Sequence, residues 1–292
     1  MNAHKGSSSS RDYTQRQPIG LASYQRSFGL KFIHESDPLP DTDPRTRILV
    51  SNHRYGMPSD LAGKSVAVVG NGCVQNSGKL IDGCDEVIRI STMRNWNRAS
   101  EHDGVKTTIW AGHPWLVVRR KADGELAPNP RFAELARAGS QLWAASPFHI
   151  SVDSYRWLKA EGHLERLLVA PPPAEIYEIG CSYFDAEELR LLFSIARQRK
   201  NVIGFSNFDL LLTGTRIVLM LELCGVTRIS LFGTNLFGFS RDGVWFGHDL
   251  MFDYKVLMRV RKRLKEKGGE FHWPDERSVK KSMIFSKFRF SI

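Results

Sequence analysis

A glycine-rich turn directly after an apolar run is the first place in the sequence where chemistry could be done. Residues 65–69 read S-V-A-V-V, and Gly70, Asn71 and Gly72 follow at once. A solid apolar run is typical of a central parallel strand, and open α/β sheets bind ligands at the carboxyl ends of such strands. Bare backbone N–H groups and one amide side chain in this turn would suit a nucleotide phosphate or ribose.

The turn differs from the dinucleotide-binding fingerprint. It reads G-N-G-C-V-Q and lacks the third glycine at the usual place, which disfavours a nicotinamide cofactor. Taken alone, the turn fits a purely structural bend as well as it fits a nucleotide site.

The turn is also part of a longer pattern. The chain reads V-A-V-V-G-N-G from residue 66, D-E-V-I-R-I from residue 85 and D-G-V-K-T-T from residue 103. This resembles the long sialyl motif of glycosyltransferase family 29, the animal-type sialyltransferases. That motif is close to C-A-V-V-G-N-S, then D-x-V-x-R-x-N, then D-x-G-x-(R/K)-T-T.

Two further blocks are similar to the other motifs of that family. Thr213 and Gly214 open a predicted helix that ends L-E-L-C-G-V and is followed by I-S-L-F-G, which resembles the short sialyl motif. His248, with Asp253 five residues on, resembles the very short motif. The three blocks occur in the family's order between about residues 65 and 260, so together they are more specific than any one of them.

The resemblance implies a fold, a reaction and a set of site residues. The fold would be α/β, a single Rossmann-like sialyltransferase domain (a GT-A-like variant) with a central, mostly parallel sheet flanked by helices. The reaction would be an inverting, metal-independent transfer of sialic acid, or of the similar keto-sugar Kdo, from a CMP-sugar co-substrate to a hydroxyl of a glycan or glycolipid. His248 would be the general base. The residues implied to bind the donor are Gly70, Asn71, Gly72, Ser91, Thr213, Gly214 and Gly233.

The residue types suit that reaction. Cytidine monophosphate is a good leaving group, so the enzyme has mainly to orient the donor and neutralise phosphate charge while the acceptor loses a proton. His248 lies at the predicted start of a helix, whose positive end keeps an imidazole neutral and able to accept that proton. Asp253 would lie about 140° around the helix from His248, which predicts a structural role for it.

The chain departs from the family at several positions. Val66 stands where the family has a cysteine, so the family's disulfide to the short-motif cysteine, here Cys224, cannot form. Ser91 replaces an asparagine, and Leu212 replaces the serine before Thr-Gly. The family's second histidine, which helps the phosphate leave, is missing from residues 230–247. The candidates to replace it are Arg216, Arg241 and Trp245.

The elements that must position these residues alternate between strand and helix. The expected strands are residues 65–69, 86–90, 107–110, 141–145, 167–169, 201–205 and 228–232. The expected helices are a short one ending near residue 83, then residues 131–138, 186–198, 214–224 and 248–267. This alternation predicts a doubly wound sheet. Residues 1–29 are expected to be a flexible tail, and residues 30–292 the glycosyltransferase domain with a basic, aromatic C-terminal segment.

Composition and charge restrict the partners. The 292 residues carry a net charge of +10, and no apolar stretch approaches the roughly 18 residues of a membrane span. Residues 254–292 hold twelve Lys or Arg against four Asp or Glu, interleaved with Met and Phe. This favours docking on an anionic membrane surface over binding nucleic acid. The four cysteines stand singly, so the predicted location is cytoplasmic, with possible peripheral attachment at the inner face of the membrane.

Other hypotheses remain open on the sequence alone. A D-x-D at residues 41–43 resembles a metal-binding motif of other glycosyltransferases, but it lies in a Pro-flanked linker, which disfavours a metal role. Bacterial family-42 sialyltransferases have a similar G-N-G turn and a catalytic histidine. The rivals are a catalytically inactive sugar-nucleotide-binding module in lipopolysaccharide or capsule assembly, and an NAD-dependent oxidoreductase. CMP binding without turnover of a donor would identify the sugar-nucleotide-binding module. NAD binding, together with an activity that does not change when His248 is removed, would identify the oxidoreductase.

Overall fold

The structure is a computed structural model, in which part of the chain is described. The described residues are 31–33, 47–50, 54–55, 58, 60–93, 96, 99–113, 117–121, 123–144, 150–169, 185–187, 211–234 and 250–275. Among them, no helix is both long enough and apolar enough to cross a membrane.

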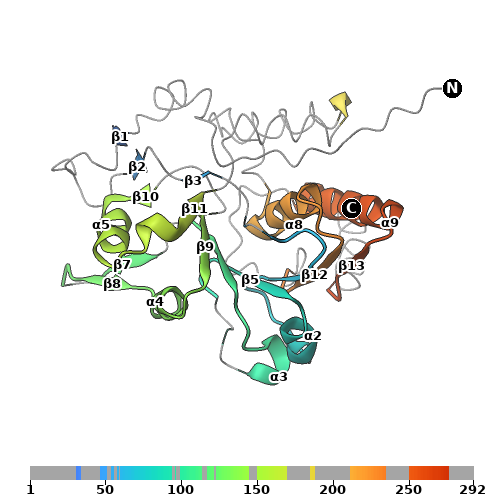
Figure 1. Ribbon diagram of the computed structural model, residues 1–292, viewed down its shortest axis with the longest axis horizontal. Helices are drawn as coiled ribbons and strands as arrows, with labels where there is room; N and C mark the ends of the chain where they lie inside the picture. Colours follow the sequence, from blue (N-terminus) through green and yellow to red (C-terminus); the bar gives the residue numbers. More distant parts are fainter. Residues whose placement is uncertain are drawn as a thin grey trace, which may run out of the picture.

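A parallel sheet forms the centre of the molecule (Figure 1). In spatial order its seven main strands are β13 (Glu270–His272), β12 (Arg228–Phe232), β4 (Ser65–Val69), β5 (Glu86–Ile90), β6 (Ile109–Gly112), β9 (Gln141–Ala144) and β11 (Leu167–Val169), and the two-residue β3 (Arg54–Tyr55) extends the β11 edge. Every neighbouring pair in this sheet is parallel. The expected α/β, Rossmann-like class is therefore confirmed.

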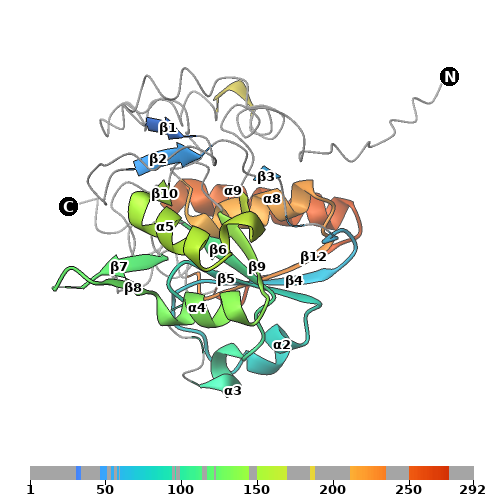
Figure 2. The ribbon, with the colours of Figure 1, turned by 60° about the vertical axis from the view of Figure 1, so that its left-hand side comes forward.

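Helices cover both faces of the sheet, which is why the central strand β4 is almost continuously apolar. On β4, Val66 and Val68 belong to the apolar cluster formed with α8 (Thr213–Leu223) and α9 (Leu250–Glu266). Ala67 and Val69 alternate with them and pack with α2 (Gly78–Asp82) on the opposite face. Figure 2 shows α8 and α9 above the sheet, with α2, α3 (Ser100–Asp103) and α4 (Pro130–Arg137) below it.

The remaining described elements lie around this core. A third apolar cluster joins α4 and α5 (Val152–Ala160) to β6 and β9. A small sheet is formed by β1 (Lys31–Ile33), β2 (Arg47–Val50) and β10 (Ile150–Ser151), and β7 (Val118–Arg120) pairs with β8 (Leu126–Pro128) in a hairpin. A 3₁₀ turn at Leu164–Arg166 leads into β11.

Among the described strands from β4 onward, the strand order reverses between β4 and β12. From β4 the chain adds β5, β6, β9 and β11 in order on one side, then returns to add β12 and β13 on the other side. The crevice outside the carboxyl ends of two strands at such a switch point is the usual ligand site of an open α/β sheet. The fold therefore directs attention to the turns that follow β4 and β12.

The element predictions agree with the structure in most places that it describes. The strands expected at residues 65–69, 86–90, 167–169 and 228–232 have the bounds of β4, β5, β11 and β12. The strand expected at residues 107–110 is instead β6, two residues later, because Thr107 and Thr108 use their hydroxyls as partners for Arg89 and Val87. The strand predicted at residues 201–205 and most of the helix predicted at residues 186–198 lie outside the described residues.

Candidate functional site

The turns after β4 and β12 are joined by backbone hydrogen bonds. The N–H of Gly70 donates to the carbonyl of Phe232, and the N–H of Gly72 donates to the carbonyl of Gly233, each at 2.8 Å. The sequence led us to expect bare N–H groups at this turn, and that expectation is wrong for Gly70 and Gly72. Both groups attach the turn to β12 instead.

This close approach is possible only because the three residues are glycines. An ideal Cβ would lie 2.5 Å from the Gly233 carbonyl oxygen at Gly70, and 2.6 Å from the same oxygen at Gly72. Gly233 itself has φ +61°, in the left-handed region, and a Cβ there would lie 2.9 Å from the Gly72 carbonyl oxygen. The glycines therefore bring two backbone turns into contact at the switch point.

Asn71 is the polar side chain that this turn presents at the sheet edge. It is half-buried, and the Thr92 hydroxyl donates to its Oδ1 at 3.3 Å. Asn71 is therefore linked to the turn that follows β5. Thr92 did not figure among the residues predicted from the sequence.

Ser91, at the end of β5, has strained backbone geometry. Its φ is +53°, a region in which asparagine is more common than serine. Its N–H donates to the Ala111 carbonyl at 2.8 Å, and its carbonyl accepts from Nε1 of Trp110 at 2.9 Å. Both bonds hold Ser91 against β6, and the surrounding structure thus maintains the strained φ.

The start of α8 reaches the same edge of the sheet. An ideal Cβ on Gly214 would lie 3.3 Å from both the Ile90 Cδ1 and the Thr234 Oγ1 atoms, and Thr234 Oγ1 would lie 3.0 Å from a Cβ on Gly70. The threonine side chain therefore lies between the β4 turn and Gly214. The first turn of α8 carries no acidic residue of its own, and Leu212 at its start has no side chain that could cap it. The positive dipole end of α8 therefore favours a negative charge at this edge.

The start of α9 is tied to the start of α8. Asp253, in the first turn of α9, is fully buried, and its Oδ1 accepts a hydrogen bond from the Leu212 N–H at 2.9 Å. This contact agrees with the structural role predicted for Asp253, because the carboxylate satisfies an N–H at the start of α8.

The structure brings together one set of predicted residues. Gly70, Asn71, Gly72, Ser91, Thr213, Gly214 and Gly233 all lie at the carboxyl edge of the sheet around β4, β5 and β12. Arg216 lies on α8 and is buried, with 3% of its surface exposed. Arg241, Trp245 and His248 lie outside the described residues.

Two further residues at this edge were not predicted. Thr234 follows Gly233 and is buried, and its carbonyl accepts a hydrogen bond from Trp273 Nε1 at 3.3 Å. The Asp275 carboxyl accepts hydrogen bonds from the N–H groups of Gly233 and Thr234. Burial raises the pKa of Asp275 above its ordinary value, although these two hydrogen bonds oppose the rise. Asp275, three residues after the end of β13, thus holds the turn that follows β12.

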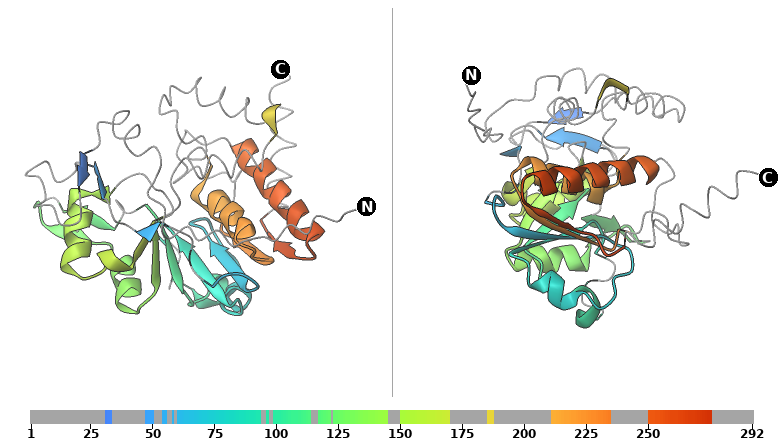
Figure 3. Two further views of the ribbon diagram at one scale, coloured as in Figure 1. Left: turned by 45° about the horizontal axis from the view of Figure 1, so that its top comes forward. Right: turned by 90° about the vertical axis from the view of Figure 1, so that its right-hand side faces the viewer.

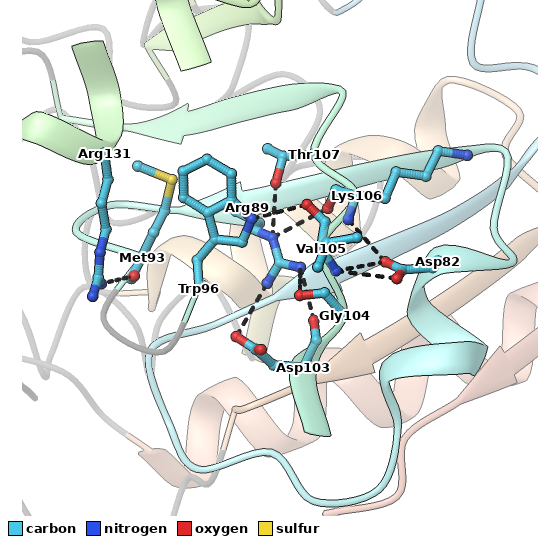
Figure 4. A network of polar contacts seen from close by, with 10 residues as sticks. All are labelled: Asp82, Arg89, Met93, Trp96, Asp103, Gly104, Val105, Lys106, Thr107 and Arg131. Carbon is cyan, nitrogen blue, oxygen red and sulfur yellow. Dashed lines mark hydrogen bonds and ion pairs between the residues drawn. The ribbon is translucent and has the colours of Figure 1, made fainter. Parts of the chain in front are cut away.

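A second polar network accounts for other parts of the sialyl-like pattern (Figure 4). Arg89 is 2% exposed and donates to the backbone carbonyls of Asp103, Gly104 and Lys106, and to the Thr107 hydroxyl. Its Nη1 lies 3.5 Å from the Asp103 carboxylate. Burial lowers the pKa of the Arg89 guanidinium, and burial also raises the pKa of Asp103. The conspicuous Arg89 thus anchors the loop that carries the D-G-V-K-T-T block.

The same loop is held from a second side. The Asp82 carboxylate accepts hydrogen bonds from the N–H groups of Val105 and Lys106, and Trp96 Nε1 donates to the Val105 carbonyl. Within the described residues, these bonds give the D-G-V-K-T-T block a structural function.

Metal-ligating and redox groups are sparse in the described part of the chain. No three His, Cys, Asp or Glu side chains gather there in a way that could hold a metal ion. The thiols of Cys73, Cys84 and Cys224 are not in disulfides, and burial raises the pKa of Cys224 to about 11. A thiol with that pKa is protonated and unreactive at neutral pH.

Comparison of the chain with protein-family models and with the sequences of curated proteins gives no match.

Proposed function

We propose that this protein is an inverting, metal-independent glycosyltransferase that transfers sialic acid, or a Kdo-like keto-sugar, from a CMP-sugar to a glycan or glycolipid hydroxyl. The observation that carries the proposal is the meeting of Asn71, Gly214 and Gly233 at the switch point between β4 and β12. These residues come from the long and short sialyl-like motifs, which are separated by more than a hundred residues of sequence.

The chemistry at this edge matches what a CMP-sugar needs. The phosphate and the sugar carboxylate are anions, and the positive dipole end of α8 lies at this edge, where the buried Asp253 carboxylate already accepts the Leu212 N–H. Asn71 offers an amide that can bond to a nucleotide oxygen or hydroxyl. Because the β4 and β12 turns are bonded to each other, the binding edge is rigid before the donor arrives.

The position of the base is supported by the start of α9. His248 precedes Leu250, the first residue of α9, by two positions in the sequence. The first turn of α9 contacts the start of α8 through Asp253 and Leu212. The described part of the chain therefore resumes after His248 at a helix whose first turn contacts the start of α8.

The proposed step is a single displacement. The acceptor hydroxyl gives its proton to the imidazole of His248, and its oxygen forms a bond to the anomeric carbon of the donor sugar. The bond from that carbon to the phosphate oxygen of CMP breaks, and the electron pair leaves with CMP. Attack and departure on opposite faces invert the anomeric centre. Arg216, Arg241 and Trp245 remain the candidates to neutralise the departing phosphate.

The test is a donor hydrolysis and transfer assay with CMP-Neu5Ac and CMP-Kdo in the presence of a chelator. The native chain should turn over one of the two donors, and His248→Ala should lose roughly 10²–10⁴-fold in rate while it retains CMP binding. His102→Gln is the matched control, because His102 is not one of the proposed site residues: it lies on α3, where its Nδ1 accepts the Asn76 N–H at 3.2 Å and its Nε2 lies 3.8 Å from the Glu101 carboxylate.

Three outcomes would contradict the proposal in different ways. Loss of turnover in chelator would contradict the metal-independent reaction, and an unaffected His248→Ala would remove His248 as the base. CMP binding without turnover of either donor would favour the inactive sugar-nucleotide-binding module instead.

A further inference from the structure

Helix α9 has two faces of different character. Its buried residues recur at helical spacing and pack on the sheet and on α8, and they are Phe252, Asp253, Val256, Leu257, Val260 and Leu264. Figure 3 shows α9 at one side of the molecule, next to α8 and β13. The opposite face of the helix points away from these elements.

That opposite face is basic. Lys255, Lys262 and Lys265 are exposed on it, and Met251 is 45% exposed. By helical pitch, each of these lysines projects within about 40° of the direction of Met251. We call these four residues the basic face. The acidic residues of α9 do not offset it, because Asp253 is buried on the other side and Glu266 is a single charge, 3.9 Å from Lys262.

We propose that the basic face docks on a bilayer that contains anionic phospholipids. Lysines around an exposed apolar side chain are typical of a helix that lies on a membrane surface, where the charges meet the headgroups and the apolar group enters between them. The exposed uncharged side chain on this face is Met251, since Met258, which projects about 20° from it, is half-buried against the core. No aromatic side chain of α9 is exposed, because Phe252 is buried and Tyr254 is half-buried. A lipid surface is therefore favoured over single-stranded nucleic acid, which is bound by stacking bases on aromatic side chains.

The location of α9 connects this surface with the proposed site. The first turn of α9 is bonded to the start of α8 through Asp253 and Leu212, and Gly214 reaches the switch point from there. Docking through α9 would hold the sheet edge near the headgroups, where a lipid-linked glycan acceptor would be found. The placement of the sheet edge near a lipid-linked acceptor depends on the proposed function, whereas docking of the basic face on the membrane does not.

The experiment is cosedimentation of the full chain with vesicles, without nucleotide. Vesicles of phosphatidylcholine alone are compared with vesicles that contain about one third phosphatidylglycerol, at low and at high salt. The native chain should bind the anionic vesicles and dissociate at high salt. The triple variant Lys255→Gln, Lys262→Gln, Lys265→Gln should bind them roughly 100-fold more weakly, since each surface lysine contributes about fivefold.

The matched control removes the same charge elsewhere. The triple variant Lys79→Gln, Lys121→Gln, Lys159→Gln alters exposed lysines on α2, before the β7–β8 hairpin turn, and on α5. It should bind within about threefold of the native chain. Equal loss in both triple variants would mean that only net charge matters, and would overturn the assignment to α9.

Two other results would also overturn the proposal. They are equal binding to neutral and anionic vesicles, and tighter binding to a single-stranded oligonucleotide that competes with the vesicles. Circular dichroism checks that each variant is folded. CMP binding is measured separately and should be unchanged in both triple variants, so a failure of the docking proposal is distinguishable from a failure of the proposed function.

Discussion

Replacing Gly72 by alanine tests the contact between the β4 and β12 turns. The new Cβ would lie 2.6 Å from the Gly233 carbonyl oxygen, which is the same atom that accepts the Gly72 N–H bond at 2.8 Å. The two turns must therefore separate by several tenths of an ångström, which weakens that hydrogen bond. Gly72 does not have a left-handed φ, so the effect comes from the close contact alone.

The expected cost is about 1–3 kcal/mol of unfolding free energy, the usual range for overpacking a rigid site. In a chain of this size each kcal/mol lowers the melting temperature by roughly 2–4 °C. Urea unfolding measures the free energy of unfolding, and a fluorescence titration measures the affinity for CMP. The affinity for CMP should also decrease in Gly72→Ala, because the turn that carries Asn71 is displaced.

Gly214→Ala is the matched control for this substitution. Its new Cβ would meet only the side-chain atoms Ile90 Cδ1 and Thr234 Oγ1, at 3.3 Å, and alanine gains about 1 kcal/mol of helix propensity over glycine. Its stability should stay within about 1 kcal/mol of the native chain. If Gly72→Ala were as stable as the native chain and Gly214→Ala were the destabilised variant, the packing argument would be refuted.

Substitutions at three further positions test other contacts of the fold. Arg89→Met should cost about 3–5 kcal/mol in urea unfolding, because it leaves the buried Asp103 carboxylate without its partner charge. Ser91→Asn should be neutral or stabilising by up to about 1 kcal/mol, and Ser91→Val destabilising, since only the first side chain tolerates φ +53°. Asp275 has a folded pKa raised by burial, so its folded form binds a proton more readily than its unfolded form. Its contribution to stability should fall as pH rises through that raised pKa, and the free-energy difference between the native chain and Asp275→Asn, followed from pH 4 upward, should decrease accordingly. A pH-independent difference would contradict this assignment.

The central strands could be predicted from the sequence because burial on two faces leaves a clear signature. The run at residues 65–69 is almost wholly apolar, residues 228–232 carry three large apolar side chains, a glycine follows each run, and both are strands with those bounds. The shift of β6 was not predictable from hydrophobicity, since it depends on the long-range partners of Thr107 and Thr108. The strand β13 has three residues, of which two are exposed, and it gives no pattern of its own.

The site could be predicted only in part. The glycine turn could be located from the sequence, but the fate of its N–H groups could not, because they bond to β12, about 160 residues later. Asp275 could not be predicted as part of this edge for a related reason. It is brought to Gly233 and Thr234 by the pairing of β13 with β12, which the sequence pattern does not indicate. Arg89, which lies in the D-E-V-I-R-I block, anchors a loop through bonds to the Asp103 and Gly104 carbonyls, and these partners too could not be read from the sequence pattern.

The most direct test of the account is hydrogen–deuterium exchange of the full chain with and without a non-hydrolysable CMP-sugar analogue. The account predicts slower exchange in peptides that contain Asn71, Thr213 and Gly233, with little change in the β7–β8 hairpin. Protection confined to other parts of the chain, or no protection at saturating analogue, would contradict a nucleotide site at the β4–β12 switch point.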